Sequence, residues 1–319
     1  MNQSPEGAAV STSQGFLALI LSIVSSSVMA VPLSERIGHT DPARYRDLKA
    51  VHDGAGSMQF EAVLDARALS TNLLFIHRGV LLPHSGIGEH FHNQCEEMFV
   101  ILDGEAQFTI DGRTSLLKGP AGAPDRLGHA HAIYNATDKP VQWLNINVGL
   151  TKTYDTFNLG DPRVDAPIDP IPQFITLRLD RSKLKPLAAA ADASKARVTV
   201  RGDVQYRRIL EPSVFFTTWS YVDQLLLAPG AAIGPENSPN MSNVYYVLAG
   251  NGTVTVDAES APFHTGDAIP IDVGQAATLS NTGTVPVELM VIGVARDMAA
   301  KAALLTAPPA NLRTDARSR

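Results

Sequence analysis

The chain carries one residue pattern twice, 146 residues apart, and this repeat limits the fold more than any other feature of the sequence. The two copies align at that shift without a gap over a long stretch. The identical pairs include Pro83 and Pro229, Ile87 and Ile233, Gly88 and Gly234, Leu102 and Leu248, Gly104 and Gly250, Thr109 and Thr255, Asp111 and Asp257, Gly128 and Gly274, and Asn135 and Asn281. Turn residues and apolar runs coincide in this way only if one domain occurs twice in the chain.

Each copy consists of short apolar runs that are separated by Gly, Pro, Asp and Asn. The runs in the first copy include 73–76, 98–104, 106–112 and 141–149. Their length is typical of strands, and the 24 Gly and 21 Pro of the chain supply many turns. Asp111-Gly112, between Ile110 and Arg113, is typical of a two-residue β-hairpin loop. The sequence therefore predicts an all-β fold.

Two short helices are expected outside the repeated region. Asp41 can cap a helix with Pro42 in its first turn, and that pattern continues as far as His52. A second helix is expected over residues 298–305, where Ala and Leu predominate.

The first copy contains a group of residues that could bind a metal ion. His90 and His92 are two apart, so on a strand both side chains point to the same face. Glu97 can return on a neighbouring strand after a short turn, and a later segment adds a third imidazole, from His129 or His131. Imidazoles with one carboxylate suit Fe(II), Mn(II), Ni(II), Cu(II) or Zn(II), with positions left open for water or substrate.

These residues resemble the two sequence motifs of the cupin superfamily. The first motif reads Gly, five residues, His-x-His, three or four residues, Glu, six residues, Gly; the second reads Pro-x-Gly-x-x-His-x-x-x-Asn. The matching residues here are His90, His92, Glu97 and Gly104 for the first motif, and Gly128, His131 and Asn135 for the second. His84 and Arg126 depart from the motifs at a Gly and a Pro that shape turns. The resemblance implies two tandem jelly-roll barrels, a bicupin, with His90, His92, Glu97 and His131 as metal ligands.

Other polar residues near the motifs are not expected to be metal ligands. Glu96 is expected to be solvated or to lie beside the ligands, and His129 to lie at the rim of the site or beside the ligands. Cys95 is expected to be a small buried residue. His77 and His84 are candidates to line the mouth of the site. The sequence leaves open whether Asn145 and Asn147 face the barrel interior.

The second copy lacks every one of the four motif ligands. At the same shift His90 becomes Glu236, His92 becomes Ser238, Glu97 becomes Asn243 and His131 becomes Ala277. We therefore expect one divalent transition metal per chain, with Fe(II) or Mn(II) first and Ni(II), Cu(II) or Zn(II) as alternatives. The second barrel is expected to pack against the first or to shape its pocket.

The expected organisation accounts for the whole chain. Its segments are a candidate signal peptide at 1–30, an N-terminal extension at 31–68, the metal-binding cupin domain at 69–150, a proline-rich linker at 151–197, a degenerate cupin domain at 198–296 and a tail at 297–319. The apolar run 16–28 is too short to span a bilayer, and the small residues at 28–30 suit a signal peptidase, although no basic residue precedes the run. A signal peptide would make the protein periplasmic or secreted; otherwise it is cytoplasmic.

Composition narrows the list of partners. A net charge of -6 gives no support to binding of nucleic acid or anionic membranes, and one cysteine excludes an internal disulfide. The expected partner is a small-molecule substrate, with a homo-oligomer left open.

Three classes of function remain. Quercetinase-like dioxygenases are bicupins with three His and one Glu, and pirin-like proteins pair a metal-bearing first cupin with an empty second one. This resemblance implies a metal-dependent dioxygenase that acts on a small phenolic or enolic substrate, with Glu97 as ligand and catalytic base. The alternatives are a redox-neutral isomerase, lyase or decarboxylase, and a non-catalytic small-molecule-binding cupin.

Overall fold

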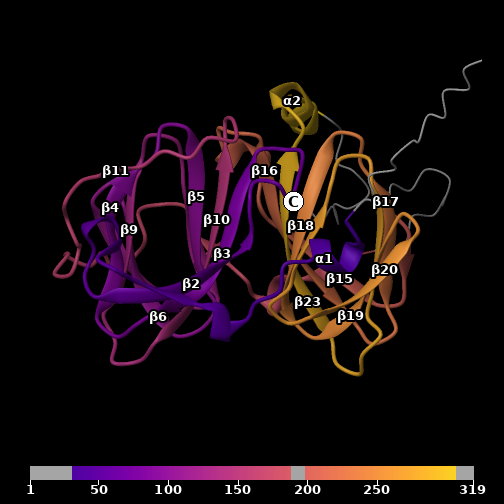
Figure 1. Ribbon diagram of the computed structural model, residues 1–319, viewed down its shortest axis with the longest axis horizontal. Helices are drawn as coiled ribbons and strands as arrows, with labels where there is room; N and C mark the ends of the chain where they lie inside the picture. The colour runs from indigo at the N-terminus through magenta and orange to yellow at the C-terminus, as the bar shows by residue number, and fades with distance from the viewer. Residues whose placement is uncertain (1–30, 188–197, 307–319) are drawn as a thin grey trace, which may run out of the picture. The chain divides into compact units, whose positions relative to one another are not determined.

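A computed structural model describes residues 31–187 and 198–306 of the chain (Figure 1). The candidate signal peptide at 1–30, the end of the expected linker and residues 307–319 lie outside the described residues. Within the described part, two strand barrels are built from the two repeats, which confirms the all-β prediction (Figure 1). None of the described helices is long and apolar enough to cross a bilayer.

The first barrel is formed by two sheets. The seven-stranded sheet has the order β1 (Arg46–Lys49), β2 (Ser57–Leu64), β3 (Leu73–Leu81), β10 (Val141–Gly149), β5 (Cys95–Ile101), β8 (Ala121–Asp125) and β12 (Leu177–Arg178). The five-stranded sheet has the order β11 (Phe157–Asn158), β4 (Ser85–Phe91), β9 (Ala130–Asn135), β6 (Glu105–Ile110) and β7 (Arg113–Lys118).

The second barrel repeats this arrangement. Its larger sheet has the order β13 (Lys185–Pro186), β15 (Val204–Leu210), β16 (Trp219–Leu227), β23 (Val287–Ala295), β18 (Met241–Ala249) and β21 (Ala268–Ile271). Its smaller sheet has the order β14 (Val200–Arg201), β17 (Ala232–Asn237), β22 (Ala276–Ser280), β19 (Asn251–Val256) and β20 (Glu259–His264). Strands β3, β6, β7 and β10 recur 146 residues later as β16, β19, β20 and β23 with the same bounds. The sequence repeat is therefore a repeat of strands.

The predicted hairpin joins β6 to β7. Ile110 pairs with Arg113, and Asp111 and Gly112 between them have φ angles of 49° and 72°. Two positive φ angles match the twist of the flanking strands, which is why this loop favours Asp-Gly.

The helix expected from Asp41 is wrong beyond its first turn. Asp41 does cap a turn, accepting a hydrogen bond from the Ala43 amide at 3.0 Å, but only the 3₁₀ turn η1 (Pro42–Arg44) forms. The chain then pairs as β1 along the edge of the first sheet, with Arg46 opposite Phe60. Backbone pairing with β2 outweighs the local helical signal there. The helix expected near the C-terminus is present as α2 (Met298–Thr306).

The flanking segments belong to the sheets. The segment 31–68 contains the short helix α1 (Leu33–Arg36), whose Leu33 is buried in the second barrel's core, and then β1 and β2 of the first barrel. The segment 151–197 supplies β11 and β12 to the first barrel and β13 to the second.

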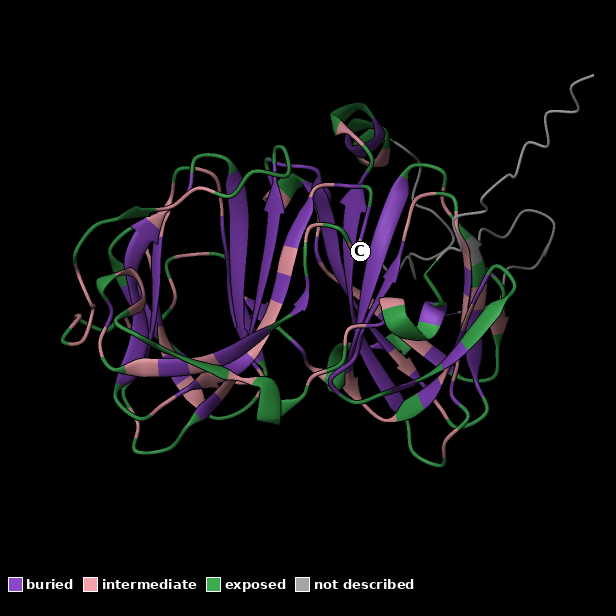
Figure 2. Ribbon diagram, viewed as in Figure 1, coloured by how far each residue is buried: buried purple, intermediate pink, exposed green. Residues whose placement is uncertain are grey.

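The central strands of the two barrels consist mostly of buried residues (Figure 2). Along β10 these buried side chains alternate between two cores. On β10, Val141 and Trp143 lie in the cluster that fills the first barrel. Leu144, Ile146 and Val148 lie in a separate cluster, which they share with Trp219 and Met290 among other residues of the second barrel's larger sheet. Odd-numbered residues of β10 therefore face the interior of the first barrel, and even-numbered residues face the second barrel.

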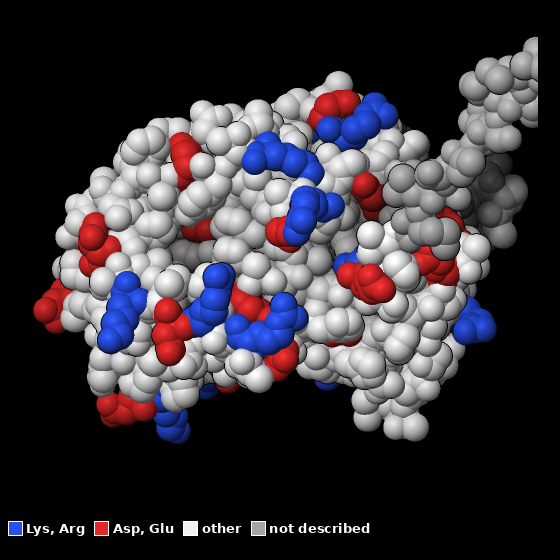
Figure 3. All heavy atoms as spheres, viewed as in Figure 1, with Lys and Arg blue, Asp and Glu red and all other residues white. Residues whose placement is uncertain are grey.

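Both signs of charge lie on the surface. On the face drawn in Figure 3, basic and acidic side chains are intermixed, and that face presents no continuous basic stripe of the kind that binds nucleic acid.

Candidate metal centre

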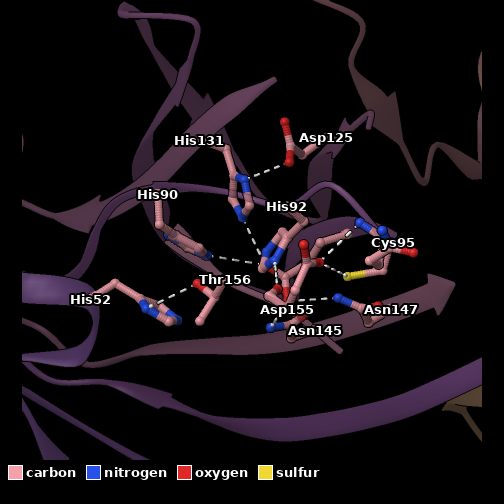
Figure 4. A network of polar contacts seen from close by, with 12 residues as sticks. His52, His90, His92, Cys95, Asp125, His131, Asn145, Asn147, Asp155 and Thr156 are labelled. Carbon is pink, nitrogen blue, oxygen red and sulfur yellow. Dashed lines mark hydrogen bonds and ion pairs between the residues drawn. The ribbon is translucent and has the colours of Figure 1, made fainter. Parts of the chain in front are cut away.

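The first barrel brings the four sequence-predicted residues together. His90 on β4 is paired with His131 on β9, His92 directly follows β4, and Glu97 lies on β5. All four side chains are buried, and their ligating atoms lie within 4.8 Å of one another. Figure 4 shows the three imidazoles gathered at one place in the barrel. The Glu97 Oε2 atom lies 2.7 Å from Nε2 of His131, 3.3 Å from Nε2 of His92 and 3.5 Å from Nε2 of His90.

Each imidazole is anchored through its other nitrogen. Nδ1 of His90 donates to the Gly88 carbonyl at 2.8 Å, and Nδ1 of His92 donates to the Asp155 carbonyl. Nδ1 of His131 lies 2.6 Å from Asp125 Oδ2. With Nδ1 directed at these oxygens, Nε2 of each ring faces the common centre and can coordinate an ion once it carries no proton.

Two carboxamides fix the orientation of the carboxylate. Asn145 and Asn147 donate through Nδ2 to Glu97 Oε1 at 2.9 and 3.4 Å. Both lie on β10 and contact Glu97, so their side chains face the barrel interior, which the sequence had left open. Glu97 Oε2 is thereby left to face the three imidazoles.

The donor set fits a divalent transition metal. His90 Nε2 is buried without a hydrogen-bond partner, which is costly unless another group satisfies its lone pair. Burial and the charge of His131 lower the pKa of His90 to about 3, so this ring is neutral and ready to coordinate. Three Nε2 atoms and one carboxylate oxygen are ligands that such ions prefer.

The pKa values of Glu97, His92 and His131 are shifted by their contacts with one another and with nearby residues. Burial alone would raise the pKa of Glu97, but the imidazoles of His131, His90 and His92 that face its carboxylate outweigh burial and hold that pKa well below its usual range. Burial disfavours the charged imidazoles, yet contacts with Cys95 and Glu97 raise the pKa of His92 to about 11. Asp125 and Glu97 likewise raise the pKa of His131 to about 9. Without a metal, the carboxylate is therefore balanced by protonated imidazoles.

The expectation for Glu96 is wrong, because this residue is neither solvated nor beside the ligands. Its side chain is fully buried on the opposite face of β5 and accepts hydrogen bonds from the amides of Phe216 and Thr217 and from the Thr217 hydroxyl, at 2.7–2.8 Å. These residues belong to the second repeat. Glu96 therefore joins the two barrels.

The remaining candidate residues from the sequence lie in different environments. His84 is paired with Asp138 at 2.8 Å on the surface and does not line the site. His129 is paired with Asp111 of the β6–β7 hairpin at 2.6 Å. Cys95 is buried, as expected. His77 faces the barrel interior, where its ring stacks on Phe75 with centroids 3.9 Å apart.

Several residues of the site were missed in the sequence. Asp125 lies opposite Glu97 in the β5–β8 register, and the Asp155 carboxylate accepts from the amides of Asn93 and Gln94. The ring of Tyr154 lies 5.2 Å from that of His92, and the ring of His52 stacks on His90 at 3.9 Å. No motif spacing points to these residues; the only signal for Tyr154 and Asp155 is that they lie within six residues after β10, the last strand of the first repeat.

The second barrel has a different interior at the equivalent place. Asn243, which replaces Glu97, accepts a hydrogen bond from the Tyr221 hydroxyl at 2.8 Å. Gly293, which replaces Asn147, leaves room for that ring, because a Cβ atom there would lie 2.2 Å from it. Among the side chains that the structure describes, the only groups of three or more potential ligands lie in the first barrel.

Comparison with known families explains the repeat. The family model described as "Cupin domain" matches residues 78–147 and again residues 224–293. The protein is a bicupin. The two matches cover the central strands of both barrels, and the first match contains all four predicted ligands.

The bicupin is similar in sequence to a binding protein and in fold to two enzymes. The bicupin is 23% identical over 92 residues to the oxalate-binding protein of Thermotoga maritima. The matched region covers 29% of this chain and 76% of that protein. It is similar in fold to the oxalate decarboxylase of Bacillus subtilis, with a TM-score of 0.53, 17% identity, and coverage of 82% of this chain and 76% of the other. It is similar also to the salicylate 1,2-dioxygenase of Pseudaminobacter salicylatoxidans, with a TM-score of 0.53, 13% identity, and coverage of 71% and 72%. At these identities the solved structures show the shared fold.

Proposed function

We propose that the bicupin is a mononuclear metal enzyme that reacts a small phenolic or enolic substrate with O2. The observation that most supports this proposal is that the Nε2 atoms of three histidines and Glu97 Oε2 lie close together in the first barrel. The proposal assigns one divalent ion to His90, His92, Glu97 and His131, with Fe(II) or Mn(II) as the first choices.

The protein residues around the ion have separate tasks. When bound, the ion supplies a Lewis acid that lowers the pKa of a coordinated hydroxyl and, as Fe(II) or Mn(II), reactivity toward O2. Gly88, Asp125 and Asp155 hold the imidazoles in one tautomer. Glu97 is the proposed acceptor of the substrate hydroxyl proton. Since its pKa is held low, the acidity of the hydroxyl itself must drive that transfer.

Aromatic rings next to the centre favour a planar substrate. The Tyr154 ring lies 5.2 Å from the His92 ring, and the Phe99 ring lies 5.1 Å from the His131 ring. Such rings offer apolar faces against which a phenol or enol can stack. The likeness to salicylate 1,2-dioxygenase agrees with this choice at the level of the fold.

Redox-neutral decarboxylation is the second candidate, and non-catalytic binding of a small carboxylate is the third. The likeness to oxalate decarboxylase, which has Mn(II) centres in the B. subtilis enzyme, favours the second. The likeness to an oxalate-binding protein favours the third.

The test is an oxygen-electrode measurement on protein that has been loaded with Fe(II) or Mn(II). Flavonols, catechols, 1,3-diketones and oxalate are offered in turn, with and without O2. The proposal expects O2 consumption with a phenolic or enolic compound, retention of this activity in Ser238→Ala, and its loss in His92→Ala. Turnover of oxalate without net O2 consumption would replace the proposal with decarboxylation, and tight binding without turnover would replace it with a binding function.

A further inference from the structure

One wall of the first barrel is a continuous row of rings that begins at a proposed ligand. The His92 ring lies 5.2 Å from Tyr154, Tyr154 lies 5.6 Å from Phe75, and Phe75 stacks on His77 at 3.9 Å. His77 in turn lies 5.0 Å from Phe60, which belongs to the barrel's interior cluster. Phe75 and His77 face inward yet remain partly exposed, and Tyr154 is 41% exposed. The rings of this wall are therefore partly accessible to solvent.

Unpaired hydrogen-bond acceptors lie next to the wall. A carboxylate can only accept hydrogen bonds, so the two amides that face Glu97 must present Nδ2 to it and turn Oδ1 away. Both Oδ1 atoms, of Asn145 and Asn147, are buried and without a hydrogen-bond partner. An unpaired buried acceptor in a binding site indicates a donor that arrives with the ligand.

His77 lies across the sheet from one of these acceptors. It lies directly opposite Asn145 in the β3–β10 register, so the two side chains share the interior face as a cross-strand pair. Burial lowers the pKa of His77 to about 4, which leaves its ring neutral at pH 7 with one nitrogen able to accept.

We propose that this wall binds a planar aromatic ligand that carries a hydroxyl group beside its metal-binding oxygen, and that Asn145 Oδ1 and His77 accept the hydrogen of that hydroxyl. The inference rests on the metal-dependent function proposed above and names its substrate class. Oxalate does not meet the requirement, because at neutral pH it has no hydrogen to donate and would face unpaired oxygens.

The test measures binding rather than turnover. Mn(II)-loaded protein is titrated calorimetrically without O2 with catechol, with 2-methoxyphenol, which lacks the second hydroxyl hydrogen, and with oxalate. We expect catechol to bind at least about tenfold more tightly than either of the others, the scale of one well-placed hydrogen bond. Catechol can also chelate the ion through both oxygens, so tighter binding of catechol does not by itself identify the hydrogen-bond acceptor. The variants below test whether His77 accepts the hydrogen bond.

His77→Phe keeps a ring against Phe75 but removes the acceptor, so the preference for catechol over 2-methoxyphenol should fall to about threefold or less. His77→Gln, which restores an acceptor, should recover part of it. The control is His84→Phe, which changes a surface histidine and should keep the full preference. Metal content is measured in every variant and should stay unchanged.

The outcomes separate this inference from the proposed function. If the protein holds Mn(II) but binds both phenols equally, binds oxalate most tightly, or keeps its preference in His77→Phe, this inference is wrong and the metal site stands. If wild-type protein holds no metal and binds none of the three, both proposals are wrong.

Discussion

The two barrels have the same strands and different interiors. In the first, Glu97 faces three imidazoles, whereas in the second Asn243 bonds to the Tyr221 hydroxyl and the ring fills the space that Gly293 leaves. Beside Tyr221, Arg208 forms a two-hydrogen-bond ion pair with Asp223, with its guanidinium carbon 4.1 Å from the centre of the ring. The comparison shows that the same strands can enclose either a group of potential metal ligands or a tyrosine ring packed among other side chains.

Metal content gives the largest expected difference between the barrels. Replacing both His90 and His92 by Ala should abolish binding of a transition metal, because two of the four proposed ligands are lost. Ser238→Ala, the matched change in the second barrel, should leave metal content unaltered. Elemental analysis of the two purified variants makes the comparison; metal retained by the double variant would contradict it.

The pH dependence of metal affinity is the next largest effect. The raised pKa values of His92, about 11, and His131, about 9, mean that both rings hold a proton at pH 7 without metal. The stabilisation that these protonated rings give to the metal-free protein is fully present at pH values below 6.5, the ordinary pKa of histidine. That of His131 is lost as pH rises through about 9, and that of His92 only near 11. Binding of Mn(II) must displace two protons, so its affinity should rise about 100-fold per pH unit between about pH 7 and 9. Calorimetric titration with Mn(II) in buffers of different ionisation enthalpy counts the protons that metal binding releases. A Mn(II) affinity that does not change with pH would contradict the assignment of protonated His92 and His131 in the metal-free protein.

Neighbouring carboxylates should differ in their effect on the metal. Glu97→Gln should weaken metal binding by at least about 10–100-fold, the range for loss of a residue that merely supports a ligand. Glu96→Gln should change affinity little and instead lower thermal stability, because three donors of the second barrel lose a charged acceptor. A larger metal defect in Glu96→Gln would mean that the assignment of the two residues is reversed.

A smaller effect is expected from closing the space in the second barrel. Gly293→Ala places a methyl group against the Tyr221 ring and should lower the free energy of unfolding by about 1–3 kcal/mol. Metal content should be unchanged. Denaturant unfolding measures the first quantity, and a variant as stable as wild type would show that the ring does not fill the space tightly.

The sequence predicts the repeat, the barrels and the four-residue group because strand alternation and motif spacing are local properties. It does not predict Asp125, because which strand lies beside β5 depends on the sheet order, and Asp125 is 28 positions from Glu97. Asp155 and Tyr154 lie in a segment that was expected to be a linker and instead packs against His92. Glu96 was misplaced because its polar side chain suggested solvent, whereas its face of β5 meets the second barrel.

The most direct measurement is an anomalous-scattering map from crystals of the Mn(II)-loaded protein. The account predicts one strong peak per chain, within coordination distance of Nε2 of His90, His92 and His131 and of a Glu97 oxygen, and no peak beside Asn243. A peak beside Asn243, or a first barrel without one at full Mn(II) loading, would contradict the account.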